Sequence, residues 1–235
     1  PRRAPAPRHR SACRARLHAL GFRSPRTAGP QPHGVLRLAL PRPLLVLATL
    51  NPGKGRELRA LLGDIPFEVR TLAELGGALP EETEDSYRGN ALLKARAAAR
   101  VAPAWALADD SGIEVDALGG APGVRSARYG GPGLDDAGRC RHLLEALHGV
   151  PPEKRTARFR CVVAIVDPAG REHLAEGVVE GLIAEAPRGA HGFGYDPVFV
   201  YLPLGRTFAE LPPQEKARVD HRGQAVRAAR RLLTG

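Results

Sequence analysis

Cysteine and long apolar runs are scarce in this 235-residue chain, and each scarcity excludes a class of protein. The three cysteines, Cys13, Cys140 and Cys161, are too few and too scattered for a disulfide framework or a zinc cage. No run of about 18 uncharged apolar residues occurs, so we expect no bilayer-spanning helix and no membrane partner. With 43% apolar and 26% charged residues, the chain can bury a sizeable core. We therefore expect an intracellular, cytoplasmic protein.

Acidic residues and lysine are absent from residues 1–43, which hold ten arginines and eight of the 22 prolines. The 35 basic and 25 acidic residues of the whole chain leave 25 of each after residue 43, so the net charge of +10 belongs to this segment. Because it cannot bury enough surface to offset its ordering entropy, we predict disorder. An organelle transit peptide, a nucleic-acid-binding arm and a start-site artefact all stay open. Arginine outnumbers lysine 31 to 4 in the whole chain, which suits spurious translation of GC-rich DNA and favours the last. The neutral remainder argues against a stable nucleic-acid partner.

Residues 44–235 show alternating strand and helix patterns, which predict one α/β domain with a mixed sheet. The first strand is the apolar run Leu44–Ala48, and the second half contains a hairpin around Pro168-Ala169-Gly170. Strands are expected at 44–48, 67–71, 105–109, 159–167, 173–184 and 198–201. Helices are expected from about 55 through 62, from 85 or 86 to 101, from 135 or 136 to 148, and over 221–233.

Known nucleotide and hydrolase signatures are missing: there is no P-loop spacing, no G-x-G-x-x-G and no G-x-S-x-G. The turn Thr49-Leu50-Asn51-Pro52-Gly53-Lys54 nevertheless joins a strand to a helix. Backbone N–H groups at a helix start, with a small residue and a lysine beside them, suit an anion. The turn predicts either a phosphate site or an ordinary turn with a surface lysine.

Carboxylates gather in two places. Four lie in the loop Glu81-Glu82-Thr83-Glu84-Asp85, which is either solvated or neutralised by a cation. Two more, in Asp109-Asp110-Ser111-Gly112, follow an apolar strand at the carboxyl end where α/β sheets bind ligands. Hard oxygen ligands of this kind suit Mg²⁺, which binds one or two carboxylates together with substrate phosphates.

Two further segments could contact a ligand. In Gly192-Phe193-Gly194-Tyr195-Asp196-Pro197, glycines flank an aromatic ring that could stack on a base or lie buried in a turn. In Lys216-Ala217-Arg218-Val219-Asp220-His221-Arg222, donors cluster before the last helix. They could read carbonyl or phosphate oxygens, or Asp220 could be a helix cap among surface cations.

Taken together and in order, these pieces resemble the inosine/xanthosine triphosphate pyrophosphatase family over residues 44–235. The motifs that carry the resemblance are Thr49–Lys54 with Glu57, Glu81-Glu82-Thr83, Asn90-Ala91 with Lys94-Ala95, Ala108–Gly112, Pro122-Gly123-Val124, Ser126–Tyr129, Gly192–Pro197 with Phe199, and Lys216 to His221-Arg222.

The resemblance implies an elongated mixed sheet with flanking helices, two lobes around a substrate cleft, and a homodimer. It implies hydrolysis of ITP, dITP and XTP to monophosphate and pyrophosphate, with Mg²⁺ as cofactor. The implied triphosphate ligands are Thr49, Asn51 and Lys54, and the implied metal ligands are Glu81 and Asp110. Asp110 is also the implied proton acceptor, and Lys54 would neutralise the leaving group. The implied base and sugar contacts are Ser111, Phe193, Gly194, Tyr195, Asp196, Lys216, His221 and Arg222.

Three positions depart from the family's pattern. Glu84 stands where the family usually has glycine, Gly89 where it usually has glutamate, and Asp220 where it usually has serine. These changes concern fine specificity, since Asp220 could weaken a base contact. Donors from Lys216, His221 and Arg222 would favour a 6-oxygen over the 6-amino group of adenine. A pyrophosphatase for modified pyrimidines and a nucleic-acid-associated protein are the alternatives.

Overall fold

The structure is a computed structural model that describes residues 42–101 and 104–234. The predictions for residues 1–41 lie outside the described residues. The strands are β1 (Leu44–Leu47), β2 (Glu68–Thr71), β3 (Trp105–Val115), β4 (Thr156–Val166), β5 (Glu172–Ile183), β6 (Phe199–Tyr201) and β7 (Arg206–Thr207). The α-helices are α1 (Pro52–Leu62), α2 (Tyr87–Val101), α3 (Asp136–Ala146), α4 (Pro213–Val219) and α5 (His221–Thr234). Within the two described ranges, no helix is long and apolar enough to cross a membrane.

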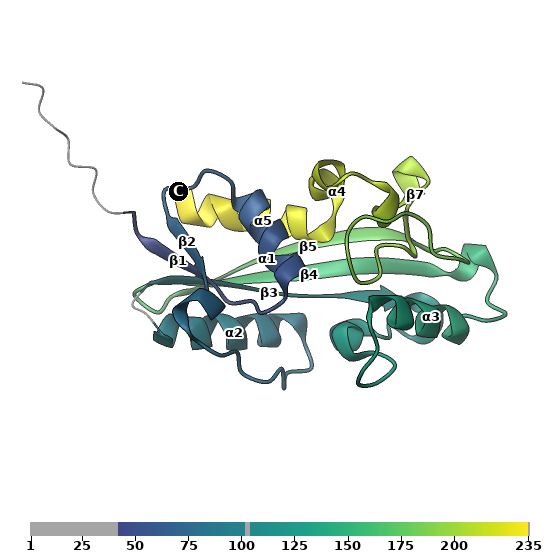
Figure 1. Cartoon of the computed structure of the whole chain (residues 1–235), viewed down its shortest axis with the longest axis horizontal. Coiled ribbons are helices and arrows are strands. Elements are labelled where there is room, and N and C mark those ends of the chain that lie inside the picture. Colours follow the sequence, from purple (N-terminus) through teal and green to yellow (C-terminus); the bar gives the residue numbers. More distant parts are fainter. Residues whose placement is uncertain (1–41, 102–103, 235) are drawn as a thin grey trace, which may run out of the picture. The chain divides into compact units, whose positions relative to one another are not determined.

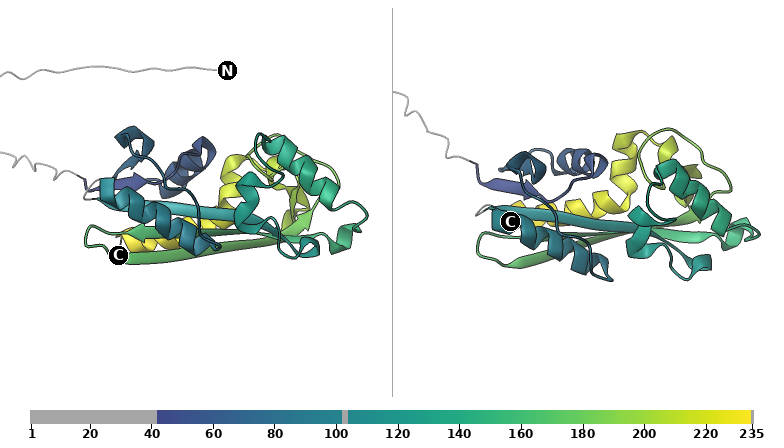
Figure 2. Two further views of the ribbon diagram at one scale, coloured as in Figure 1. Left: turned by 90° about the horizontal axis from the view of Figure 1, so that it is seen from below. Right: turned by 60° about the horizontal axis from the view of Figure 1, so that its bottom comes forward.

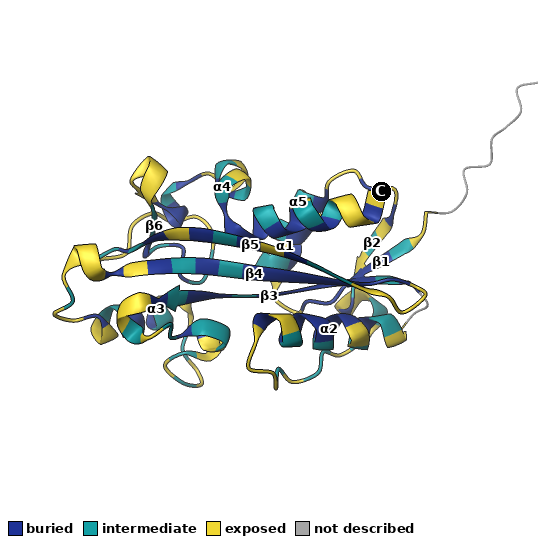
Figure 3. Cartoon of the chain, turned by 180° about the vertical axis from the view of Figure 1, so that it is seen from behind, coloured by how far each residue is buried: buried dark blue, intermediate teal, exposed yellow. Residues whose placement is uncertain are grey.

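The seven strands form one mixed sheet in the order β2-β1-β3-β4-β5-β6-β7 (Figure 1). Strand β1 is parallel to β2 and β3, whereas every pair from β3 to β7 is antiparallel. The long strands β3, β4 and β5 run side by side through the whole body (Figure 3). The predicted α/β class, a mixed sheet with flanking helices, is confirmed.

Helices cover the sheet at two separate places (Figure 2). At the end that contains β1, α1 and α5 pack on one face through Leu58 and Val226, while α2 packs on the other through Ala91 and Ala95. At the other end, α3 packs through Leu143 on a core that includes phenylalanines of β4 and β6. The cleft described below lies between these two groups of helices.

Strand β3 is longer than predicted, and this difference positions the site. The polar run after Leu107 predicted an end near Asp109, yet the strand continues to Val115. Its partner β4 holds it in register throughout, because Asp110 pairs with Val162 and Gly112 with Arg160. A long-range ladder thus keeps polar residues in an extended conformation that their local sequence does not favour.

Other predicted bounds differ by one to three residues. Helix α1 begins at Pro52 rather than near Gly55, because Asn51 caps it and proline suits its first turn. Helix α3 ends at Ala146 rather than at His148. The hairpin at 168–170 is confirmed, with β4 and β5 paired on both sides of it. Helix α4 was not predicted, because its sequence PQEKARV has no apolar period.

Candidate active site

The cleft opens where β1 stops. Its last residue, Leu47, pairs with Leu107, so beyond that point no strand of the described residues lies beside β3 on this side, and its edge is next covered at the bridge between Glu114 and Pro122. Side chains alternate along a strand, and Asp109 and Asp110 therefore point to opposite faces of the sheet. Asp109 faces α1 and α5, whereas Asp110 faces α2. A ligand at this edge can reach groups on both faces.

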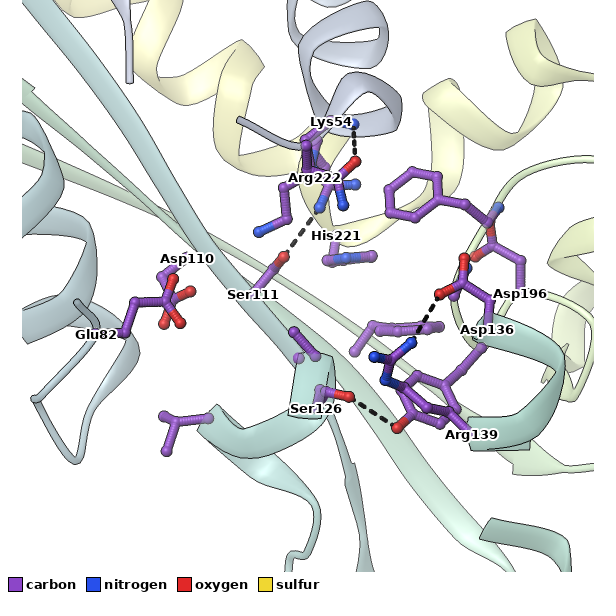
Figure 4. Close-up of a pocket in the computed structure, with 18 of the residues that line it drawn as sticks. Lys54, Glu82, Asp110, Ser111, Ser126, Asp136, Arg139, Asp196, His221 and Arg222 are labelled. Atoms are coloured by element: carbon purple, nitrogen blue, oxygen red, sulfur yellow. Dashed lines mark hydrogen bonds and ion pairs between the residues drawn. The ribbon is translucent and has the colours of Figure 1, made fainter. Parts of the chain in front are cut away.

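A cavity of about 270 Å³ lies at this edge (Figure 4). Most of the residues predicted to act on substrate line it, although they come from distant parts of the chain. These are Asn51, Lys54, Asp110, Ser111, Phe193, Gly194, Tyr195, Asp196, Lys216, His221 and Arg222. Thr49 and Glu81 are the two predicted site residues that do not line it. The structure thus assembles the predicted set around a single cavity.

The turn before α1 forms one wall of the cavity. The Asn51 side chain accepts the backbone N–H of Lys54 at 3.1 Å and so caps the helix. Thr49, which is buried, accepts the backbone N–H of Asn51 at 3.2 Å, and this bond stabilises the turn. The ammonium group of Lys54 lies 3.2 Å from Asp109, a buried carboxylate. A helix N-terminus and a lysine therefore converge on the cavity, as anion binding requires.

Asp109 holds two cations in place. Besides Lys54 it accepts Nε and Nη2 of Arg222, each at 3.3 Å. Burial alone would raise the pKa of Asp109, but the charges of Lys54, Arg222 and Lys94 outweigh it and hold this pKa well below its usual value. Asp109 is therefore ionised at physiological pH and positions groups that line the cavity.

Asp110 lies opposite the acidic loop. It accepts Asn90 Nδ2 at 3.3 Å and the ammonium group of Lys94 at 3.2 Å, and Lys94 also contacts Glu82 at 2.7 Å. Burial, partly offset by Lys94 and Lys54, raises the pKa of Asp110. Figure 4 shows the carboxylates of Glu82 and Asp110 pointing toward each other at the edge of β3. One ammonium group thus bridges two carboxylates that both face the cavity.

Glu81 lies apart from this pair. It is exposed and lines an open hollow beside Arg125 and Arg128, outside the cavity. In the described residues, no three His, Cys, Asp or Glu side chains are grouped closely enough to hold a metal ion. Any metal here would depend on one or two carboxylates, with water and ligand oxygens completing its shell.

The glycine-rich loop builds the opposite wall. Gly192 has a φ of +75°, and a Cβ there would lie 2.0 Å from an oxygen of Asp196, so only glycine fits. Asp196 accepts the backbone N–H of Phe193 at 2.9 Å, and the Tyr195 hydroxyl donates to the Ser126 carbonyl at 2.9 Å. These bonds hold the loop with the half-buried Phe193 ring facing the cavity.

Lys216 and Arg222 are already paired with carboxylates. Lys216 lies 2.8 Å from both Glu57 and Asp196, and Arg222 binds Glu57, Asp109 and the hydroxyl of Ser111. Both cations are almost completely buried. The base-reading role predicted for them therefore competes with a structural role, which is to join the last two helices to α1 and β3.

His221 contributes an aromatic surface. Its ring stacks on Phe159 with centroids 4.6 Å apart and planes 6° apart. Burial and the neighbouring Arg222 and Lys216 hold the pKa of His221 well below its usual value, so the ring is neutral at physiological pH. Its Nδ1 is buried without a hydrogen-bond partner among the described residues. Together with Phe193 these rings give the cavity an aromatic end.

The three departures from the family's pattern have structural explanations. Asp220 does not line the cavity; it is buried and caps α5 by accepting the backbone N–H of Gly223 at 2.6 Å. Glu84 and Gly89 are linked, because a Cβ at Gly89 would lie 2.7 Å from the Cβ of Glu84. The glutamate at 84 thus fills space that glycine at 89 leaves free.

Several residues of the site were not assigned roles from the sequence. Glu57, Asn90 and Lys94 were recognised only as parts of motifs, and Asp109 only as a neighbour of Asp110. Had β3 been predicted through Ser111, the alternation of side chains would have separated the two aspartates. The partnership of Glu57 with Lys216 joins residues 159 positions apart, and nothing local signals it.

The fold and the site define an α/β protein whose cleft is charged at one end and aromatic at the other. The family model described as the Ham1 family matches residues 45–232, and the chain belongs to this family, which confirms the resemblance. It is 52% identical over 185 residues to the dITP/XTP pyrophosphatase of Syntrophobacter fumaroxidans, covering 78% of each chain. It is 44% identical over 189 residues to that of Bacillus subtilis, covering 80% of this chain and 96% of the relative. The structure is similar to that of a HAM1 protein from Coxiella burnetii, with a TM-score of 0.74 and 42% identity over 80% of this chain and 97% of that one.

Proposed function

We propose that this protein hydrolyses non-standard purine nucleoside triphosphates, dITP, ITP and XTP, to the monophosphate and pyrophosphate. The observation that carries the proposal is the two-ended cavity. Lys54, the α1 N-terminus and the Asp110–Glu82 pair suit a metal-bound triphosphate, and the Phe193, His221 and Phe159 rings suit a base. The names of the similar proteins support the same substrates.

The residues present fit a divalent cation. Asp110 and Glu82 offer hard carboxylate oxygens that face each other; Lys94 contacts both, and Arg128 contacts Glu82 at 3.5 Å. Mg²⁺ held there would neutralise phosphate oxygens and favour attack at phosphorus. The proposal assigns the metal to Asp110 and Glu82, whereas the resemblance assigned Glu81 in place of Glu82.

The chain's own groups perform the other steps. Asp110 accepts a proton from a water molecule as the water oxygen attacks the α-phosphorus. The bond from this phosphorus to the bridging oxygen breaks, and pyrophosphate leaves with the electron pair. Lys54, held by Asp109, neutralises the charge that develops on the leaving group. No covalent intermediate on the protein is required.

A panel of triphosphates with Mg²⁺ tests the reaction. ITP, dITP and XTP should give pyrophosphate, with ATP, GTP and dUTP much slower; orthophosphate as the first product would refute the proposal. A pyrimidine preferred over ITP would instead favour the alternative enzyme. Asp110→Asn should lower kcat by about 100-fold or more.

A matched pair of variants tests the metal assignment. Glu82→Gln should raise the Mg²⁺ concentration needed for half-maximal rate, whereas Glu81→Gln should leave it close to that of the parent. The reverse result would return the metal to Glu81, as first predicted.

Assembly and location complete the proposal. The homodimer rests on the family resemblance alone, and light scattering of the purified protein tests it. A cytoplasmic location follows from the nucleotide pool on which such an enzyme would act, and fractionation of cells with an antibody to the protein tests it. The substrate partner is a free nucleotide rather than a nucleic acid, since the body of the chain is neutral.

A further inference from the structure

Arg139, in the first turn of α3, brings unused donors to the cavity. Its side chain lines the cavity and is 19% exposed. Its one ion pair within the described residues is a 3.5 Å contact with Asp136, a carboxylate that is 56% exposed. Its Nε is buried without a hydrogen-bond partner among the same residues. Apart from the contact with Asp136, the guanidinium group has no ion-pair partner among the described residues, and the exposed part of the side chain is where a ligand could bind its N–H groups.

The other cations of the cavity are more fully engaged. Lys216 makes two contacts of 2.8 Å, Arg222 binds two carboxylates and a hydroxyl, and Lys54 contacts Asp109 at 3.2 Å. A guanidinium group carries five N–H donors and no acceptor. Among the cations that line the cavity, Arg139 therefore has the most donors free for a ligand.

If the proposed function holds, the position of Arg139 relative to the phosphate-binding groups determines which part of the nucleotide it contacts. Figure 4 shows Arg139 on the opposite side of the cavity from Lys54 and Arg222. In a purine nucleotide the sugar is attached at N9, so the edge with positions 6, 1 and 2 points away from the phosphates. With the phosphates near Lys54, this edge faces His221 of α5 at one corner and Arg139 of α3 at the other.

We infer that Arg139 reads position 2 of the purine. Xanthine carries an oxygen there, which accepts from the guanidinium group; hypoxanthine carries a hydrogen, and guanine an amino group that is itself a donor. The nearby acceptor, Asp136, is already engaged by the backbone N–H of Gly194 at 2.8 Å and by Arg139. The amino group of guanine therefore meets the donors of Arg139 and must share the Asp136 oxygens with bonds already made, so GTP is disfavoured although it shares the 6-oxygen of ITP.

Arg139→Met tests this inference, because methionine keeps most of the side-chain bulk and removes the donors. We expect the kcat/KM ratio of XTP to ITP to fall about ten-fold or more, the loss expected for one hydrogen bond to a charged donor, and the ratio of GTP to ITP to rise. Arg139→Lys should lie between the parent and Met. The matched control is Arg141→Met, an exposed arginine on the same helix that does not line the cavity.

Ratios measured on one preparation are independent of the fraction that is folded. Unchanged XTP:ITP and GTP:ITP ratios in Arg139→Met would overturn the inference, and so would a change confined to ATP:ITP, which would assign Arg139 to position 6. These failures differ from failure of the proposed function, in which the parent protein itself would release no pyrophosphate from ITP.

Discussion

The buried carboxylate of Asp220 should weaken the fold at neutral pH. Burial, reinforced by Glu57 and only partly offset by Lys216 at 3.8 Å, raises its pKa from 3.8 to about 6. A group with a raised carboxyl pKa binds more protons in the folded than in the unfolded state between these two values. Stability contributed by its protonated form is therefore lost as pH rises from about 4 to 6, and the loss is complete above pH 6.

The size of the effect follows from the two pKa values. A difference of about two pKa units corresponds to about 3 kcal/mol at pH 7.5, and at pH 4.5 only about 1 kcal/mol of it has developed. Asp220→Asn removes the charge but keeps the oxygen that caps α5 through Gly223. For a domain of this length we expect Tm to rise by about 6–12 °C at pH 7.5 and by about 2–4 °C at pH 4.5.

Thermal unfolding followed by circular dichroism at the two pH values measures this difference. The matched control is Asp135→Asn, since Asp135 caps α3 in the same way, at 2.7 Å from the N–H of Gly138, but is exposed. The control should change Tm by no more than a degree or two at either pH. An Asp220→Asn protein that is less stable than the parent at pH 7.5, or equally stabilised at both, would refute the reasoning.

Four other outcomes are expected. Gly89→Glu alone should destabilise the protein by about 1 kcal/mol or more, because Glu84 fills the space that the new side chain needs. Adding Glu84→Gly should recover most of the lost stability. If the effects of the two substitutions on the unfolding free energy are strictly additive, residues 84 and 89 are not coupled. Asp109→Asn should lower the unfolding free energy by about 3–5 kcal/mol, since the buried Arg222 and the half-buried Lys54 lose their partner. Near-parental stability in denaturant would contradict this. Deleting residues 1–40 should leave Tm and ITP turnover unchanged, and a large loss of either would show that the segment docks or binds substrate. An analogue of ITP with a non-hydrolysable bridge between the α- and β-phosphorus should bind much more weakly in EDTA than with Mg²⁺ in a titration calorimeter, and equal affinities would argue against the proposed metal.

Local patterns predicted much of the fold. The apolar run at Leu44–Leu47, the hairpin near Gly170 and the amphipathic α5 all show the periodicity of the element that forms. The predictions that failed depend on residues far apart in the chain. Strand β3 continues past Asp109 because β4 pairs with it, and α4 forms where three carboxylates contact Lys216. No periodicity in the sequence reports such partners.

The candidate site shows the same division between residue types and their geometry. Ordered motifs predicted which residues gather, including Lys54 and Asp110 with the glycine-rich loop. They could not show that Asp109 and Asp110 have different roles, because the face of the sheet to which each side chain points depends on whether the strand continues through both residues. They also did not show that Arg222 pairs with Glu57 and Asp109. Because of this pairing, Arg139 has more N–H groups available to a ligand than Arg222 has.

The balance of charge around the cleft is an argument for the proposed metal. The carboxylates outnumber the cations with which they pair, the carboxylates being Glu57, Glu82, Asp109, Asp110, Asp196 and Asp220, and the cations Lys54, Lys94, Arg128, Lys216 and Arg222. A triphosphate brought to this site would add negative charge where the protein already has an excess, in a partly buried setting where charges interact strongly. Since Lys54, Lys94, Lys216 and Arg222 are already paired, the proposed function calls for further positive charge where two carboxylates face the cavity with a single ammonium group between them. Asp110 and Glu82 occupy that place, so under the proposed function the same excess of carboxylates that would repel a free nucleotide would favour its magnesium complex.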